Sequence, residues 1–172
     1  MPALDEHNKY IYYQVVEQPG LAADTLQERA LYFLKTNYPE NIVEQGETSG
    51  NIKGTGKFLI TNTLAVVKHI YGEVDYDYCI ECKNGKYRYW LTNFIYIPHK
   101  TDRYGNSVPE QGTEVPMEDW AKKLEKHDQD ICFEETAAYY KQFGDKLRQN
   151  MVKTSPVSHK EAAKKVIVTK DW

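Results

Sequence analysis

Cysteine is scarce in this sequence. The chain of 172 residues has three, Cys79, Cys82 and Cys132. Small domains that depend on disulfides carry dense and usually even-numbered cysteines, so the odd count argues against a disulfide framework. Free cysteines are typical of a reducing compartment, but three of them are too few to assign one.

Long apolar runs are absent as well. No stretch approaches the roughly 18 apolar residues of a membrane-spanning helix, so we expect no membrane span in this chain. The first residues, MPALDEHNK, are acidic and polar, unlike the apolar core of a signal peptide. We therefore expect no leader within this chain, and composition alone leaves the localisation open.

The chain also lacks a basic patch. Its formal net charge is −3, and charges of both signs are dispersed along it. Proteins that bind nucleic acid usually cluster Lys and Arg, because phosphate neutralisation supplies much of the affinity. The one basic stretch, 153–170, lies in a segment over 153–172 that we expect to be a mobile C-terminal tail. The composition therefore predicts no nucleic-acid partner.

Tyrosine is the abundant residue, with 14 copies against five Phe and three Trp. It favours half-buried strand faces, where the ring packs and the hydroxyl reaches water. Apolar residues make up 41% of the chain, which is enough for a packed core. The length fits one domain, which we place at 7–152. The prediction is a single α+β domain with a sheet that has a wet face or edge.

Alternating side chains predict several strands. The first covers 7–17, and further strands begin near Asn41 and continue to Tyr71. A regular alternation follows over 74–82. Asn84-Gly85 is the strongest hairpin signal in the chain, and it leads into a return strand over 86–97.

Apolar residues at spacings of three and four predict two main helices. The first follows Asp24, which we expect to cap it with Gln27 in a capping box, and its buried stripe is Leu26, Ala30, Phe33 and Leu34. The second covers 130–151, with a stripe of Phe133, Ala137, Tyr140, Phe143, Leu147 and Met151. Gly144 falls on the same face, where a neighbour can approach closely.

A polar segment over 98–116 separates the return strand from the C-terminal helices. It contains three prolines and two glycines, and it is long for a connection in a compact domain. Such connections are either functional or mobile. A short helix over 117–125 that presents Trp120 and Leu124 is predicted to follow it.

Three stretches of the chain resemble one bacterial family. They are Gly50-Asn51-Ile52-Lys53-Gly54-Thr55-Gly56, Cys82-Lys83-Asn84-Gly85-Lys86-Tyr87-Arg88-Tyr89 and Leu91-Thr92-Asn93-Phe94. With the strand and helix before them, they resemble the domain of unknown function with TBP-like fold that is widespread in Bacteroidetes, over about 8–97. The resemblance implies a curved antiparallel sheet of about five strands, in the order strand, helix, then four strands, with a helix against one side. It also implies a periplasmic or cell-envelope protein, and it supplies no catalytic residues.

The return strand is apolar on both faces. Trp90, Phe94 and Tyr96 alternate along one of them, with Arg88 beside them. Such a face is a platform for a ligand or a protein, a homodimer interface, or a surface that a C-terminal helix covers. The candidate ligand-binding residues are therefore Trp90, Phe94, Tyr96 and Arg88.

The sequence contains no recognisable metal or cofactor motif. Cys79 and Cys82 have the C-x-x-C spacing, but residues i and i+3 of a strand point to opposite faces. No second pair or histidine cluster completes a zinc site. Asp75, Asp77 and Glu81 share a strand face, where a solvent-facing polar row is typical. We predict no metal, no cofactor and no catalytic residue with a recognisable motif.

The histidines His69, His99 and His127 stand singly in the sequence. No nucleophile elbow accompanies them, although catalytic triads assemble from distant positions. Two hypotheses follow. The first is a non-catalytic binding or assembly module of the bacterial cell envelope that uses the sheet face or the 98–116 segment. The alternative is an enzyme with a distributed site near that segment.

Overall fold

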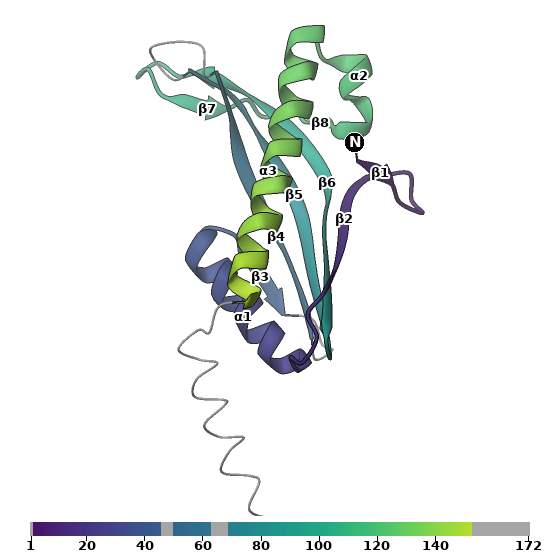
Figure 1. Ribbon diagram of the computed structural model, residues 1–172. Coiled ribbons are helices and arrows are strands. Elements are labelled where there is room, and N and C mark those ends of the chain that lie inside the picture. The colour runs from purple at the N-terminus through teal and green to yellow at the C-terminus, as the bar shows by residue number, and fades with distance from the viewer. Residues whose placement is uncertain (1, 46–49, 63–68, 153–172) are drawn as a thin grey trace, which may run out of the picture. The chain divides into compact units, whose positions relative to one another are not determined.

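The computed structural model describes residues 2–45, 50–62 and 69–152 (Figure 1). The chain divides into two compact units. Unit 1 consists of Met1–Tyr13, Thr55–Tyr78 and Trp90–Lys141, and unit 2 of Gln14–Gly54, Cys79–Tyr89 and Gln142–Trp172. The predicted tail over 153–172 lies outside the described residues, and the boundary of one domain at 7–152 stays a prediction.

The described strands form an eight-stranded sheet. They are β1 (Ala3–Leu4), β2 (Tyr10–Glu17), β3 (Ile42–Gln45), β4 (Asn51–Asn62), β5 (His69–Lys83), β6 (Lys86–Thr101), β7 (Ser107–Pro109) and β8 (Val115–Pro116). The order is β1-β2-β6-β5-β4-β3, with β7 and β8 paired to β6. The α+β class is confirmed. The expected count of about five strands was too low, because the short strands β1, β7 and β8 carry no alternating apolar pattern.

The described helices are α1 (Ala23–Asn37), the short 3-10 helix η1 (Met117–Asp119), α2 (Trp120–Lys123) and α3 (Lys126–Val152). Both predicted main helices are present. The long helix begins at Lys126, earlier than the predicted Asp130. The prediction missed this first turn because its residues are polar and carry no apolar spacing. The predicted helix over 117–125 is split between η1 and α2, and Leu124 follows the end of α2.

Aromatic side chains form the core of unit 1, where α3 lies along one face of the strands (Figure 1). The ring of Tyr139 stacks on Phe58 with 4.2 Å between centroids, and its hydroxyl lies 2.6 Å from that of Tyr76. The ring of Tyr140 stacks on Tyr12 at 4.7 Å. Tyr12 and Tyr76 are thus buried between helix and sheet, rather than half-buried on a wet face as we expected for strand tyrosines.

Trp120 fixes α2 and η1 in unit 1. Its side chain is fully buried and meets Phe133 of α3 edge-on, with 5.1 Å between ring centroids. The indole Nε1–H donates to the carbonyl oxygen of Val115 at 2.8 Å. The buried ring with a satisfied N–H explains why so short a helix is held in place.

Unit 2 contains α1, which packs against the C-terminal end of α3. Phe33 meets Phe143 edge-on at 5.2 Å, and the ring of Tyr89 lies 6.1 Å from that of Phe143. The guanidinium of Arg29 donates to the carbonyl oxygen of Met151. The predicted stripe of α1 is buried as expected, namely Leu26, Ala30, Phe33 and Leu34.

The expected capping box of α1 was wrong. The helix begins after Ala22, and no side chain of that residue caps it. The amide N–H of Ala23 instead donates to Oδ1 of Asn84 at 2.9 Å, and Oε1 of Gln27 accepts from the amide of Gly50 at 3.1 Å. The hairpin at Asn84 thus supplies the acceptor that we had assigned to Asp24.

The buried stripe of α3 also differs from the prediction in unit 1. Ala137 is exposed, and Cys132 and Thr136 are buried in its place. The spacing of three and four is compatible with a buried face through Ala137 or through Cys132 and Thr136. The stacking of Tyr139 on Phe58 and of Tyr140 on Tyr12 turns the second face toward the sheet. In unit 2 the predicted Phe143, Leu147 and Met151 are buried.

The segment over 98–116 is mostly a hairpin rather than a polar loop. Strand β6 continues to Thr101, and β7 returns antiparallel to it with Thr101 opposite Ser107 and His99 opposite Pro109. In the turn, Oδ1 of Asp102 accepts from the amides of Tyr104 and Asn106, both at 2.8 Å. Aspartate favours such turns because its carboxylate satisfies backbone N–H groups, so a polar composition here does not exclude pairing.

Candidate functional site

Asn93 interrupts the alternation of β6. Its φ is 53°, a left-handed conformation that asparagine tolerates better than most residues. Leu91 is buried before it, and Phe94 and Tyr96 are buried after it. One extra residue in a strand, as in a β-bulge, makes the following side chains change faces. Trp90 therefore points away from the side on which Phe94 and Tyr96 lie.

The predicted shared face of Trp90, Phe94 and Tyr96 was therefore wrong. Phe94 is 1% exposed and Tyr96 4% exposed, beneath α3 as the helix-covered alternative predicted. Phe94 meets Tyr12 edge-on at 5.7 Å, and the hydroxyl of Tyr96 donates to the carbonyl oxygen of Tyr71 at 3.2 Å. Burial, with smaller contributions from the nearby Cys132 and Asp128, raises the pKa of Tyr96. Both rings are core residues of unit 1.

Trp90 lies on the opposite side of the sheet, where its ring is 6.2 Å from that of Tyr13. Trp90 is half-buried, whereas Tyr13 is 47% exposed. Alternation places further side chains of unit 1 on this side, and we call the set the open face: Tyr13, Leu59, Asp77, Trp90 and Thr92. Leu59 is 46% exposed. The open face thus exposes two large apolar side chains, Tyr13 and Leu59, beside the half-buried Trp90.

Arg88 lies in unit 2, and its guanidinium contacts the carboxylate of Glu81. The Arg88 side chain is 46% exposed. Exposed ion pairs contribute little to stability, because water screens both charges. Arg88 thus has a local acidic partner, and its predicted role in ligand binding stays a prediction.

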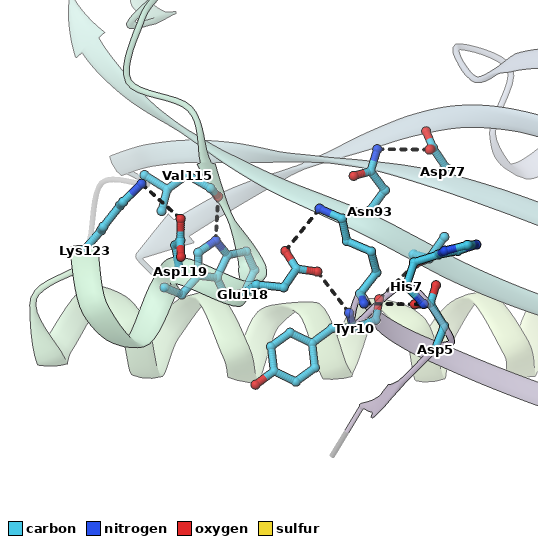
Figure 2. Close-up of polar contacts among 12 residues, drawn as sticks. Asp5, His7, Tyr10, Asp77, Asn93, Val115, Glu118, Asp119 and Lys123 are labelled. Atoms are coloured by element: carbon cyan, nitrogen blue, oxygen red, sulfur yellow. Dashed lines mark hydrogen bonds and ion pairs between the residues drawn. The ribbon is translucent and has the colours of Figure 1, made fainter.

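Polar side chains link several elements of unit 1 (Figure 2). Nδ2 of Asn93 donates to Oδ2 of Asp77 at 3.1 Å, and the hydroxyl of Thr92 donates to the carbonyl oxygen of Tyr10 at 3.0 Å. The side chain of Glu118 accepts from the amide of Tyr10 at 3.0 Å and lies 3.7 Å from the ammonium of Lys9. Figure 2 shows that the contacts of Glu118 tie the start of β2 to η1, so they hold the N-terminal segment in place.

The predicted solvent-facing row of carboxylates is only partly correct. Asp75, Asp77 and Glu81 are all half-buried. Burial and the neighbouring Glu73 raise the pKa of Asp75, although Lys57 opposes the change. Among the described residues, Oδ1 of Asp75 is buried without a hydrogen-bond partner. Glu73 and Asp75 are therefore neighbouring carboxylates whose charges repel each other in a partly buried place.

His99 has the partners that its isolation in the sequence concealed. Its Nε2 lies 3.2 Å from Oε2 of Glu73 on β5, and its Nδ1 lies 2.9 Å from the hydroxyl oxygen of Ser107 on β7. The ammonium of Lys57 is 3.9 Å from the same carboxylate oxygen of Glu73. Sequence reasoning missed this cluster because neither Glu73 nor Ser107 belongs to a motif. Predicting a hairpin over 98–109 from the sequence would have placed Ser107 next to His99.

Comparison with known proteins identifies the family. A family model described as "Domain of unknown function (DUF4468) with TBP-like fold" matches residues 12–97. This chain belongs to the DUF4468 family. The match confirms the resemblance to that family. No curated protein matches the sequence.

Two solved structures share the fold of this DUF4468 chain. One is a TBP-like protein from Parabacteroides distasonis, with a TM-score of 0.69, 14% identity, and coverage of 90% of this chain and 99% of that one. The other is a DUF4468 family protein from Bacteroides ovatus, with a TM-score of 0.67, 13% identity, and coverage of 90% and 92%. At this identity the likeness establishes the TBP-like fold and no activity.

Burial makes the cysteine thiols of the DUF4468 chain weak acids. All three are free and buried. Burial raises the pKa of each thiol to about 12, so the thiolate that binds metals or attacks substrates is scarce at neutral pH. Within the described ranges, no group of three or more His, Cys, Asp or Glu side chains is arranged to hold a metal ion. Among the described helices, none combines the length and hydropathy that a bilayer crossing requires.

The bulge at Asn93 yields a test by paired substitutions. Asn93→Ala should lower the free energy of unfolding by about 1–2 kcal/mol, because alanine pays the left-handed backbone penalty and loses the contact with Asp77. Asn93→Gly removes the same amide without that backbone penalty, so it should cost less. Chemical denaturation of both variants measures the difference. Equal costs would show that the backbone conformation of Asn93 contributes nothing.

Proposed function

We propose that this DUF4468 chain is a binding or assembly module that holds a protein partner on the open face of unit 1, by contacts that need no catalysis. The observation that carries the proposal is the pairing of Tyr13 and Trp90 on the side of the strands opposite α3. Tyrosine and tryptophan are enriched at the energetic centres of protein interfaces, since each buries a large area at a low cost in side-chain entropy.

The surroundings of the two rings support a protein partner rather than a small ligand. Small-molecule sites are usually concave and enclose most of their ligand. The two rings instead project from neighbouring strands of a sheet, an arrangement that suits a broad contact with a protein. Thr92 and the hydrogen-bonded pair of Asp77 and Asn93 supply polar groups in the same region of unit 1. An aromatic centre with a polar rim is the usual composition of a protein interface.

The partner is expected to be another protein of the bacterial cell envelope. This location rests on the family resemblance, which implies export. A nucleic-acid partner is disfavoured by the net charge of −3, because phosphate binding requires clustered positive charge. A second copy of the chain is the competing occupant, and the experiment below separates it from a different protein.

Site-specific photocrosslinking in the native cells tests where the partner binds. A photoreactive phenylalanine replaces Leu59 on the open face, and the matched control replaces Ala138, which is exposed on α3. We expect one envelope protein to be crosslinked from position 59 and not from position 138. Crosslinks only between copies of the chain would replace the partner with a homodimer. Identical products from both positions would contradict binding on the open face.

Affinity for the purified partner tests the two rings directly. The double variant Tyr13→Ala, Trp90→Ala should bind about 30-fold more weakly, which corresponds to the roughly 2 kcal/mol of an interface hot spot. Tyr104→Ala is the matched control, because Tyr104 is 74% exposed and lies in the turn between β6 and β7. Titration calorimetry gives the affinities, and thermal melting verifies that each variant is folded. Unchanged affinity in the folded double variant would contradict the proposal.

The alternative hypothesis is an enzyme with a site near the 98–116 segment. It has one specific observation in its favour, the contacts of His99 with Glu73 and Ser107 in unit 1. These residues are not part of the Tyr13–Trp90 pair, so the two hypotheses are tested by different variants.

A further inference from the structure

Three neighbouring strands of unit 1 bring together a carboxylate, an imidazole and a hydroxyl. Glu73 comes from β5, His99 from β6 and Ser107 from β7. Oε2 of Glu73 lies 3.2 Å from Nε2 of His99, and Nδ1 of His99 lies 2.9 Å from Oγ of Ser107. The imidazole thus bridges the other two groups through its two nitrogens, which is the connectivity of a Ser-His-acid triad.

The hairpin holds the serine and the histidine in register. Thr101 lies opposite Ser107, so Ser107 is a diagonal neighbour of His99 on the same face of the ladder. The turn is fixed by Asp102, which accepts hydrogen bonds from the amides of Tyr104 and Asn106. Gly105 takes a φ of 84° within the same turn, a value that suits glycine. Strand pairing therefore places Ser107 on the same face as His99, within reach of its imidazole.

The three groups differ in their exposure to solvent. The side chains of His99 and Glu73 are 5% and 8% exposed, whereas Ser107 is exposed to solvent. A buried imidazole between a carboxylate and a hydroxyl has a preferred tautomer, because a carboxylate can only accept a hydrogen bond. Nε2–H then donates to Glu73, and the lone pair of Nδ1 accepts the hydroxyl proton of Ser107. This arrangement leaves an exposed nucleophile next to a buried base.

The two ring nitrogens exchange their usual roles in this cluster. In the Ser-His-Asp proteases the acid faces Nδ1 and the serine faces Nε2. General-base catalysis needs one nitrogen that is held as N–H and one that faces the nucleophile, and either assignment satisfies that need. The carbonyl oxygen of Ile70 lies 3.5 Å from the Ser107 hydroxyl, so it is a weaker acceptor than Nδ1 at 2.9 Å.

We propose that Ser107 is an activated nucleophile that hydrolyses carboxylic esters, with His99 as its general base and Glu73 as the residue that positions His99. Oγ of Ser107 attacks the acyl carbon while its proton passes to Nδ1 of His99. The bond from the acyl carbon to the alkoxy oxygen breaks, and the alcohol leaves with that proton. Water then gives a proton to Nδ1 and attacks the acyl group, and Ser107 recovers the proton as the carboxylic acid departs.

Lys57 lies at the acid end of the cluster, where Asp75 is a second neighbour of Glu73. Its ammonium is 3.9 Å from Oε2 of Glu73 and its side chain is 59% exposed. A cation at this position stabilises the negative carboxylate, and the carboxylate in turn stabilises the imidazolium that forms when His99 takes the proton. Lys57 therefore acts on the acid end of the cluster, and the serine end stays open to a substrate.

Covalent labelling of the intact chain tests the nucleophile. The probe is a fluorophosphonate, which forms an Oγ–P bond and releases fluoride when it meets an activated serine. Peptide mass spectrometry should find the adduct on Ser107, and Ser107→Ala should abolish it. Thr101→Ala is the matched control, because Thr101 faces Ser107 across the same hairpin and should be dispensable. A folded native protein that forms no adduct, or an adduct on another residue, would overturn the proposal.

The base and the positioning residue have separate readouts. His99→Gln should slow both labelling and the hydrolysis of p-nitrophenyl acetate by about 100-fold or more. Glu73→Gln should have a similar effect, since an amide can donate to Nε2 and move the imidazole proton to Nδ1. Nitrogen-15 NMR of His99 should show the Nε2–H tautomer in the native protein and its loss in Glu73→Gln. A native Nδ1–H tautomer, or labelling that His99→Gln leaves unchanged, would overturn the proposal while the binding module stands.

Discussion

Replacing Gly72 with alanine should lower the free energy of unfolding by about 3 kcal/mol. A Cβ atom at this position would lie 2.5 Å from Cε2 of Tyr96 and 2.6 Å from the carbonyl oxygen of Ile97. Real contacts of Cβ atoms essentially never fall below 3.0 Å, so a neighbour must move. One of these neighbours is backbone in the adjacent strand β6, which cannot rotate away without breaking the ladder.

Chemical denaturation of the intact chain measures the free energy of unfolding of the Gly72→Ala variant and of the native protein. Ala138→Leu is the control, because it adds atoms at an exposed site of α3 and should change stability by less than about 0.5 kcal/mol. Adding Tyr96→Leu to Gly72→Ala should not restore stability, since the carbonyl oxygen of Ile97 stays in place. A Gly72→Ala variant as stable as the native protein would show that the strands separate easily at this point.

Replacing Gly144 with alanine should destabilise unit 2 by about 2 kcal/mol, although the same change usually stabilises a helix interior by about 1 kcal/mol. The added Cβ would lie 2.2 Å from the hydroxyl oxygen of Tyr89 and 3.2 Å from Cζ of that ring. Tyr89 is 1% exposed, so its ring has little room to shift. The glycine therefore makes space for one tyrosine hydroxyl.

A double-mutant cycle isolates that contact. Tyr89→Phe removes the hydroxyl, and with it the closest of the atoms that a Cβ at position 144 would meet. In this background Gly144→Ala should cost close to nothing, which gives a coupling energy of about 2 kcal/mol by denaturant unfolding. The weak contact of Arg148 with the same hydroxyl, at 3.5 Å, adds only a small cost to Tyr89→Phe alone. An equal cost of Gly144→Ala in both backgrounds would contradict the steric explanation.

The two proposals for function differ in what they require of the chain. Binding on the open face depends on the rings of Tyr13 and Trp90, whereas ester hydrolysis depends on Ser107 and His99. A chain that loses its partner through Tyr13→Ala, Trp90→Ala but keeps fluorophosphonate labelling would carry both functions. Loss of both with either set of variants would instead indicate general disruption of unit 1.

Much of the fold could be predicted because its signals are local. The Asn84-Gly85 turn, the period-two alternation of β5 and the apolar stripe of α1 all depend on residues within a few positions of each other. The family resemblance rests on the same stretches, and the family model matches residues 12–97. Local geometry alone was enough for the α+β class and for most of the core.

The candidate sites depended on the tertiary structure. One left-handed residue, Asn93, moved Phe94 and Tyr96 into the core and left Trp90 on the open face. Strand pairing, and no motif, brought Ser107 and Glu73 to His99.

The sequence by itself therefore determined the class, the family and most of the buried stripes, since these follow from the period of each element. Only the tertiary structure decided which faces the aromatic rings occupy, which group caps α1 and which side chains surround His99. Those features depend on the register between strands that are distant in the chain, and a shift by one residue reverses every side chain beyond it.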